Sequence, residues 1–197
     1  MQKIFAAENL LDFPVNENAS PTQKLPILVR GKTFPRSGVA RWGLLPSHAS
    51  HDDKILAAKL KNARSETILE KKSFSDLWHK GRKCIVPASG FYEWPEEKIK
   101  GHPGYSISVQ SGTFGMAGLW NKTEEILTFT ILTCEATSSL RDIHSRMPVM
   151  FSPQASMEWL FSDIDPAYTM MRRDNITEGF MVEERAASAE TSSPLLF

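Results

Sequence analysis

The sequence has few cysteines, no excess of either charge and no long apolar run. Cys84 and Cys134 are the only two cysteines in 197 residues, and neither lies in a Cys-x-x-Cys spacing. A disulfide framework and a cysteine-based zinc site are therefore excluded. Lysine and arginine together number 23, as do aspartate and glutamate. No global basic field attracts nucleic acid, so any such binding must use a local groove.

The lack of long apolar segments bears on the location of the protein. No run approaches the roughly 20 apolar residues that span a bilayer. The first residues, Met1 to Phe5, also lack the apolar stretch of a signal peptide. We therefore expect a cytoplasmic protein that does not bind membranes. Nothing in the sequence suggests an obligate assembly, a metal or a cofactor. We therefore also expect a monomer that binds no metal and no cofactor.

The residues that are present are typical of one globular domain. Apolar residues make up 41% of the chain and charged residues 23%. Strand-length patterns dominate, as where Tyr105, Ile107 and Val109 alternate with polar residues. Further strands are expected at residues 25–29, 39–46 (a strand followed by a turn), 113–120 and 126–134. We predict a β-rich α+β fold, with one domain over residues 1–197 that ends in a loose tail at 186–197.

Two short helices complete this prediction. Residues 73–79 have helical spacing and are followed by Gly81, which is a typical residue after a helix end. A second helix is expected over 153–161, where Ser152 can cap the N-terminus and proline occupies the first turn. Pro26 has no N–H group, which favours an edge position for the strand at 25–29. Both cysteines lie in apolar stretches, so we expect buried packing thiols.

Glu93 is the most informative polar residue. It is flanked by Phe91, Tyr92 and Trp94, and a carboxylate that aromatic rings desolvate has a raised pKa suited to proton transfer near neutral pH. The alternative is a strand glutamate that points to water while the rings turn away. His144 poses the same choice, because a histidine between Ile143 and an Arg-Met-Pro turn is either catalytic or a hydrogen-bonded structural residue.

The remaining candidates also have two interpretations. Asn62 and Arg64 either belong to a site or begin or cap a helix. Arg41, Arg64 and Arg146 either bind phosphate or are ordinary surface cations. Trp42 and Trp94 are either core residues or, beside arginines, a stacking platform for single-stranded nucleic acid.

Several segments in a fixed order decide between these interpretations. Together they resemble the SOS-response-associated peptidase (SRAP) family, over roughly residues 16–161. The segments are Asn-Ala-Ser-Pro-Thr-Gln at 18–23, Arg-Trp-Gly-Leu-Leu-Pro at 41–46, Asn-Ala-Arg-Ser-Glu-Thr at 62–67, Arg-Lys-Cys-Ile-Val-Pro-Ala-Ser-Gly-Phe-Tyr-Glu-Trp at 82–94, Ala-Gly-Leu-Trp at 117–120, Phe-Thr-Ile-Leu-Thr at 129–133 and Ile-His-Ser-Arg-Met-Pro-Val at 143–149.

The resemblance implies a barrel-like sheet around a positively charged cleft. It also implies a DNA-damage protein that recognises abasic sites in single-stranded DNA and bonds to them covalently. In the family, the nucleophile is an N-terminal cysteine exposed when the initiator methionine is removed. Its amine attacks the sugar aldehyde and its thiol closes a thiazolidine, which fits the general reactivity of amines toward carbonyl groups.

The same resemblance implies roles for six residues of this chain. Asn62 would orient the sugar, Glu93 would move protons at the amine and the sugar hydroxyl, and His144 would assist ring opening. Arg64 and Arg146 would hold the phosphates that flank the lesion. Trp42 would support the kinked strand beside it.

The beginning of the sequence departs from the family. It starts Met1-Gln2-Lys3 and has no cysteine before Cys84, and the segment ahead of residue 18 is shorter than in the family. Three interpretations stay open: a start codon upstream of Met1, a degenerate paralogue, or a substitute nucleophile such as Cys134. Three functions stay open as well: a covalent abasic-site protein, a non-covalent DNA-binding module, and a peptidase that would use Cys134 with His144.

Overall fold

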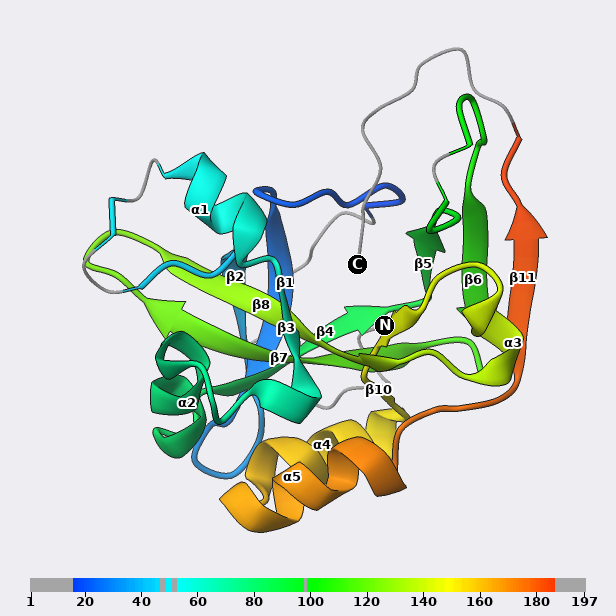
Figure 1. Cartoon of the computed structure of the whole chain (residues 1–197). Helices are drawn as coiled ribbons and strands as arrows, with labels where there is room; N and C mark the ends of the chain where they lie inside the picture. Colours follow the sequence, from blue (N-terminus) through cyan, green and yellow to red (C-terminus); the bar gives the residue numbers. More distant parts are fainter. Residues whose placement is uncertain (1–15, 47–48, 51–52, 98, 187–197) are drawn as a thin grey trace.

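The computed structural model describes residues 16–46, 49–50, 53–97 and 99–186 (Figure 1). Its centre is a closed barrel in which strands pair in the order β7-β4-β1-β2-β8 and β8 pairs back with β7. Only the β2–β8 pairing is parallel within this ring. The barrel strands are β1 (Lys24–Val29), β2 (Arg36–Trp42), β4 (Lys83–Ala88), β7 (Phe114–Lys122) and β8 (Leu127–Glu135). The predicted β-rich α+β fold is confirmed.

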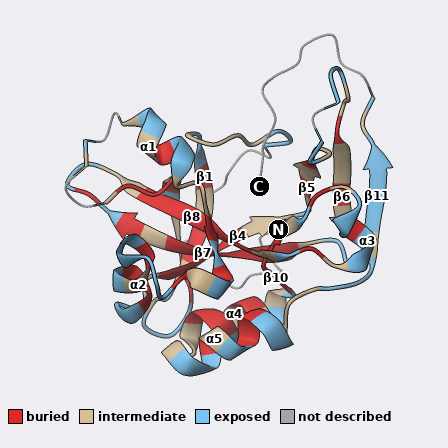
Figure 2. Cartoon of the chain, in the orientation of Figure 1, coloured by how far each residue is buried: buried red, intermediate tan, exposed pale blue. Residues whose placement is uncertain are grey.

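Alternating side chains fill two cores on opposite faces of the barrel strands. In β4, Cys84 and Val86 point into the core that the barrel shares with the small second sheet, whereas Ile85 points into the core beneath the helices. In β8, Phe129 and Leu132 divide in the same way. This period of two is the expected signature of strands buried on both faces. Figure 2 shows the barrel strands as largely buried.

The helix-side core is covered by α2 (Lys72–His79), α4 (Pro153–Phe161) and α5 (Ile164–Arg173). Trp78 of α2 and Trp159 of α4 are both buried, with ring centroids 6.4 Å apart. Aromatic pairs of this kind stabilise a core beyond the area that they bury. Helices α4 and α5 form an antiparallel pair under the barrel in Figure 1.

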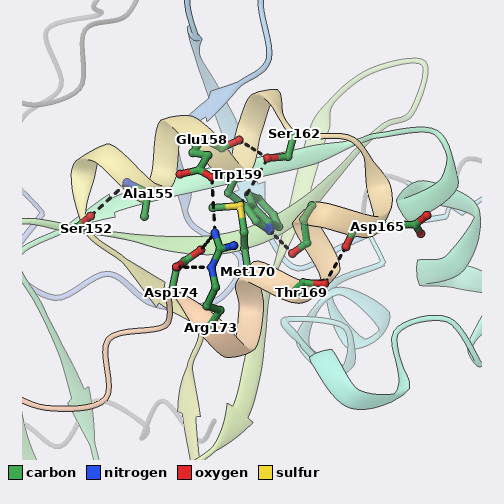
Figure 3. A network of polar contacts seen from close by, with 11 residues as sticks. Ser152, Ala155, Glu158, Trp159, Ser162, Asp165, Thr169, Met170, Arg173 and Asp174 are labelled. Carbon is green, nitrogen blue, oxygen red and sulfur yellow. Dashed lines mark hydrogen bonds and ion pairs between the residues drawn. The ribbon is translucent and has the colours of Figure 1, made fainter.

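Side-chain contacts hold the α4–α5 pair together, as Figure 3 shows. The indole Nε1 of Trp159 donates to the carbonyl oxygen of Ala167 at 3.2 Å. Arg173 contacts both Glu158 of α4, at 3.6 Å, and Asp174, at 2.7 Å. These ion pairs are exposed and contribute little, so the buried indole is the firmer link between the two helices.

A second, three-stranded sheet stands beside the barrel in the order β11-β6-β5. Strand β5 (Gly90–Glu93) follows β4 after one residue, so the chain passes directly from the barrel into this sheet. Strands β6 (Tyr105–Val109) and β11 (Phe180–Glu184) complete it. Glu93 is the last residue of β5 and lies opposite Tyr105 of β6.

Short elements extend the barrel along β8. Strand β3 (Asn62–Arg64) pairs with β8 in parallel, with Arg64 opposite Thr133. Strand β9 (Arg146–Pro148) pairs with β8 from its other side, with Pro148 also opposite Thr133. The end of β8 therefore lies between two segments that are about 80 residues apart in the sequence. The remaining elements are α1 (Lys54–Lys59), η1 (Ser65–Thr67), α3 (Ser138–Arg141) and β10 (Met150–Phe151).

Gly43 makes one close approach possible. Its φ of 120° lies in the range that L side chains rarely adopt. A Cβ built there would be 2.5 Å from the carbonyl oxygen of Ala57 in α1. The turn after β2 can thus lie directly against α1, and Leu44 donates to the carbonyl oxygen of Leu60 at 3.1 Å.

Most predicted elements are confirmed, including the helix end at Gly81, whose φ is 63°, and the cap in which Ser152 accepts from the backbone N–H of Ala155 at 3.2 Å. The edge position of 25–29 is wrong, because β1 pairs with both β2 and β4. Only Leu28 and Val29 pair with β4, so Pro26 lies where the missing N–H is tolerated.

Three further expectations need correction or lie outside the description. Residues 62–64 form a strand and do not begin a helix, although Arg64 is the N-cap residue of the short helix η1. Cys84 is fully buried as expected, but Cys134 is only partly buried. The expected loose tail at 186–197 lies outside the described residues except for residue 186. Among the described helices, none is long and apolar enough to cross a membrane.

Candidate functional site

The pairing of β3 and β9 with β8 creates a pocket of about 290 Å³. Three of the six predicted site residues, Asn62, Arg64 and Arg146, line it together with Thr133 of β8. The pocket is also lined by residues that the sequence analysis did not single out: Lys59, Leu60, Ala63, Lys71, Ser73 and Phe74. Two of the predicted arginines therefore share one hollow rather than lying as separate surface cations.

Arg146 is held in a defined orientation. Its Nη1 and Nη2 donate to the two carboxylate oxygens of Glu66 at 2.8 and 2.9 Å, and Nη2 also donates to the carbonyl oxygen of Thr133 at 2.7 Å. A bidentate pair of this kind fixes the guanidinium plane. The Nε atom of Arg146 is buried without a hydrogen-bond partner. The bond to Arg146 contributes to a lowered pKa of Glu66, against desolvation that raises it.

Asn62 has an unusual environment for an amide. Both its Nδ2 and its Oδ1 atom are buried, and neither has a hydrogen-bond partner. An unsatisfied buried polar group costs about 1–3 kcal/mol. Folded proteins rarely carry two on one side chain, so such a group indicates a bound water, an ion or a ligand.

Glu93 is buried, with 2% of its surface exposed. Its Oε1 accepts the backbone N–H of Trp94 at 3.1 Å, while its Oε2 has no partner. Burial raises the pKa of Glu93 to about 8, against the lowering effects of the Trp94 N–H and the Lys61 ammonium. A carboxyl group with this pKa can both donate and accept a proton near neutral pH. The sequence prediction of a desolvated Glu93 is thus confirmed.

Lys61 links Glu93 to the pocket. Desolvation lowers the pKa of Lys61, and the nearby Glu93 carboxylate opposes that shift. The carbonyl oxygen of Lys61 accepts the indole Nε1 of Trp42 at 2.9 Å and the backbone N–H of Ile131 at 3.0 Å. Asn62 is the next residue, so these two bonds also fix the backbone that presents its amide.

Trp42 itself is a core residue. Only 3% of its surface is exposed, and its ring stacks on Phe129 with centroids 6.4 Å apart and an interplanar angle of 11°. Of the two interpretations of Trp42, the structure therefore supports a core residue, and its implied support of a DNA strand stays a prediction. Its indole is linked to the candidate site through the carbonyl oxygen of Lys61.

His144 lies just ahead of β9 and is buried, with 7% exposed. Its Nδ1 accepts the backbone N–H of Arg146 at 3.0 Å, which places the proton of the neutral ring on Nε2. The adjoining Ser145 donates twice to Glu96, at 3.1 Å from each of its backbone N–H and hydroxyl groups. The loop after Glu93 is thereby bonded to the loop that contains His144, although among the described residues no hydrogen bond joins the Glu93 and His144 side chains directly.

Aromatic residues around Glu93 hold an arginine. The guanidinium carbon of Arg185 lies 4.1 Å from the ring centroid of Tyr92 and 5.4 Å from that of Trp94. Cation–π contacts of this kind stabilise partly buried sites by roughly 1–2 kcal/mol. Arg185 follows β11, so it braces the small sheet next to the carboxyl group.

Neither cysteine has the features of an activated nucleophile. Burial raises the pKa of the Cys84 thiol well above its ordinary value. Burial likewise raises the pKa of Cys134 to about 11, and its Sγ accepts the Asn175 amide at 3.2 Å. Reactive thiols have lowered pKa values. A search of the described residues finds no group of three or more histidine, cysteine, aspartate or glutamate side chains that could hold a metal ion.

Sequence reasoning missed Lys59, Lys61, Glu66 and Lys71. Glu66 lies within the 62–67 segment, so its place in the motif was visible although its partner was not. The three lysines are separated by polar, lysine-rich sequence and have no local mark that distinguishes them from solvated surface residues. Only the packing of α1 and α2 beside β3 brings Lys59 and Lys71 to one pocket.

Comparisons with known proteins agree with this geometry. The model of the family described as SOS response associated peptidase (SRAP) matches residues 2–184. The chain is 38% identical over 158 residues to the abasic site processing protein YobE of Bacillus subtilis. This match covers 77% of this chain and 71% of YobE. It is also 34% identical over 190 residues to the abasic site processing protein YoqW of the same organism. That match covers 91% of this chain and 84% of YoqW.

More distant relatives extend the comparison. The chain is 31% identical over 184 residues to the abasic site processing protein HMCES of Rattus norvegicus, and the match spans 73% of this chain but only 52% of that protein. A crystal structure of a protein from Bordetella bronchiseptica superimposes with a TM-score of 0.76 at 26% identity, over 94% of each chain.

Proposed function

The chain belongs to the SRAP family, and we propose that it processes abasic sites in single-stranded DNA at the site formed by Asn62, Glu93 and His144. The observation that carries the proposal is that both amide atoms of Asn62 and the Oε2 atom of Glu93 are buried without a hydrogen-bond partner within the protein. Asn62 also lines a pocket whose lining includes two arginines. The names of the relatives, abasic site processing proteins, supply the substrate class.

In this proposal each side chain has one role. The Asn62 amide orients the sugar of the lesion, because its donor and its acceptor are both available to the sugar oxygens. Glu93 exchanges protons with the opening sugar, since its pKa of about 8 lets both protonation states be populated near neutral pH. The Nε2–H of His144 assists ring opening.

In the same proposal, Arg64 and Arg146 bind the phosphates of the DNA strand. Arg64 is exposed at the end of β3, and Arg146 faces the same pocket from β9. Arginine suits phosphate recognition because its planar fork of donors matches the phosphate oxygens. Trp42 is a positioning residue here, acting through the Lys61 carbonyl oxygen.

The test uses a single-stranded oligonucleotide with one abasic site and an otherwise identical intact oligonucleotide. We expect tighter native binding of the abasic strand, and its conversion, seen on a denaturing gel as a shifted or a cleaved strand. Equal binding of the two strands together with no conversion would refute the proposal.

A second candidate function is a non-covalent module that binds abasic or single-stranded DNA. It is favoured by the described thiols, because the pKa values of Cys84 and Cys134 are raised rather than lowered. The same observation weighs against a peptidase that uses Cys134 with His144. Retained preference for the abasic strand on a native gel, with no altered strand on the denaturing gel, would select the module. In either case we propose a cytoplasmic monomer, and light scattering of the protein–DNA complex checks the stoichiometry.

A further inference from the structure

The pocket beside Asn62 contains more positive charge than the two predicted arginines. Four cationic side chains line it: Lys59, Arg64, Lys71 and Arg146. They come from four different places, the last residue of α1, the last residue of β3, the residue before α2 and the first residue of β9. No aspartate or glutamate lines the pocket.

Most of this charge is not neutralised within the protein. Arg146 is paired with Glu66 at 2.8 Å. Within the described ranges, Lys59, Arg64 and Lys71 have no ion-pair or hydrogen-bond partner through their side chains, and all three are exposed. Three like charges around one hollow repel each other, so the arrangement is most stable when an anion occupies it.

The other lining groups suit an anion with several oxygen atoms. Thr133 and Ser73 carry hydroxyl donors, and Asn62 carries the buried amide that has no partner. Helix α2 begins next to the pocket, and Lys71, its N-cap residue, makes no side-chain capping bond. The backbone N–H groups of its first turn therefore add donors and the positive end of the helix dipole.

We propose that this pocket is a phosphate-binding site, in which Lys59 and Lys71 act with Arg64 on one phosphate group of the bound DNA strand. The inference rests on the proposed function and deepens it, because Asn62 belongs both to the pocket and to the candidate site. The phosphate held here is thus the one that neighbours the sugar being processed. The proposed site extends the phosphate contacts beyond the two arginines to lysines at the end of α1 and the start of α2.

The first experiment compares two charge-matched double variants of the full chain. Lys59→Gln with Lys71→Gln removes two lysines that line the pocket. Lys54→Gln with Lys72→Gln removes two exposed lysines from the same helices that do not line it. Both variants change the net charge equally, so a difference between them reports on the pocket rather than on the overall charge.

The readout is the salt dependence of binding to the abasic single strand. Each phosphate contact contributes about 0.7 to the slope of log K against log salt for single strands. Because the site holds one phosphate group, we expect the pocket variant to lose up to about 0.7 from this slope, and the control variant to retain the wild-type slope. Equal slopes for the two double variants would overturn the inference.

A second experiment separates the pocket from the proposed function. Inorganic phosphate is titrated into the wild-type protein and the pocket variant while backbone amide signals are followed by NMR. Saturable shifts of Ser73 and its neighbours in the wild type, lost in the pocket variant, support a phosphate site even if the protein does not bind abasic DNA. Their absence in the wild type contradicts it, whatever the DNA experiment gives.

Discussion

Two buried ionisable groups in this protein differ in how fully their polar atoms are hydrogen-bonded. Lys83, in the core beneath α4, is 3% exposed, and its Nζ donates to the carbonyl oxygens of Trp159 at 2.5 Å and Ser162 at 2.6 Å. Glu93, at the end of β5, is 2% exposed and has one oxygen with no partner. Burial shifts both pKa values to about 8, Lys83 downward and Glu93 upward.

The contrast distinguishes a structural group from a candidate functional one. The ammonium group of Lys83 binds the last carbonyl groups of α4, which otherwise lack intrahelical donors, and it also lies 5.3 Å from the ring centroid of Trp159. It therefore stabilises the fold. Glu93 carries the cost of desolvation without full compensation, and an uncompensated buried polar group points to a ligand or to chemistry.

The largest effect is expected at Glu93. The substitution Glu93→Gln keeps the shape but removes the exchangeable proton, so the rate of abasic-strand conversion should fall about 10²- to 10⁴-fold. The rate is measured on denaturing gels, with the exposed Glu97→Gln as the matched control. A variant that converts the strand at the wild-type rate would remove Glu93 from the mechanism.

The same substitution should change the pH dependence of stability. Because the pKa of Glu93 is raised from 4.5 to about 8, the native state holds its proton more tightly than the unfolded state does. Its contribution to stability is full below pH 4.5 and is lost as the pH rises toward 8. Relative to wild type, Glu93→Gln should gain at most roughly 5 kcal/mol in unfolding free energy across this window.

Urea unfolding at pH 5 and pH 8 checks this sign. A difference between variant and wild type that stays constant with pH would mean that the folded state does not raise the pKa of Glu93. Burial is the main cause of the raised pKa of Glu93; the Trp94 N–H and the Lys61 ammonium lower this pKa, and the Glu96 carboxylate raises it.

At Lys83 we expect a loss of stability with little change in DNA binding. Lys83→Met leaves two buried carbonyl oxygens without donors, so the unfolding free energy should fall by about 1–3 kcal/mol. DNA binding by the folded protein should stay within about twofold of wild type, since a factor of two is only about 0.4 kcal/mol. Lys80→Met, at an exposed position, is the control. If Lys83→Met lost DNA binding while keeping its stability, the contrast between the two groups would fail.

The smallest effect is expected at Trp42. Trp42→Phe keeps an aromatic ring on Phe129 but removes the hydrogen bond to the Lys61 carbonyl oxygen, which is worth about 1 kcal/mol. Conversion of the abasic strand should slow several-fold because the backbone before Asn62 loses one of its two fixed bonds. Trp120→Phe serves as the control, as its ring contacts Arg82 and not Lys61. Equal stability of Trp42→Phe and wild type would show that the indole N–H is not needed.

Local sequence predicted the parts of the fold that depend on local rules. The alternation in 105–109, the serine cap before α4 and the glycine after α2 each depend on a few neighbouring residues. The edge assignment of β1 failed because barrel closure gives β1 a second neighbour, which no local pattern encodes. Strand β3 was missed for a similar reason, since three residues carry no period and pair only because β8 is present.

For the site, the sequence by itself determined the aromatic neighbours of Glu93 and the order of the segments that mark the family. Successive side chains of a strand point to opposite faces, so the burial of the Glu93 carboxylate was decided by the tertiary structure. Tertiary structure alone decided that Trp42 is buried, that Glu66 fixes Arg146 across 80 residues, and that four cations from separate elements share one pocket. The physical reason is that these contacts depend on the long-range hydrogen-bond registers of β3 and β9 on β8, which side-chain type and spacing do not specify.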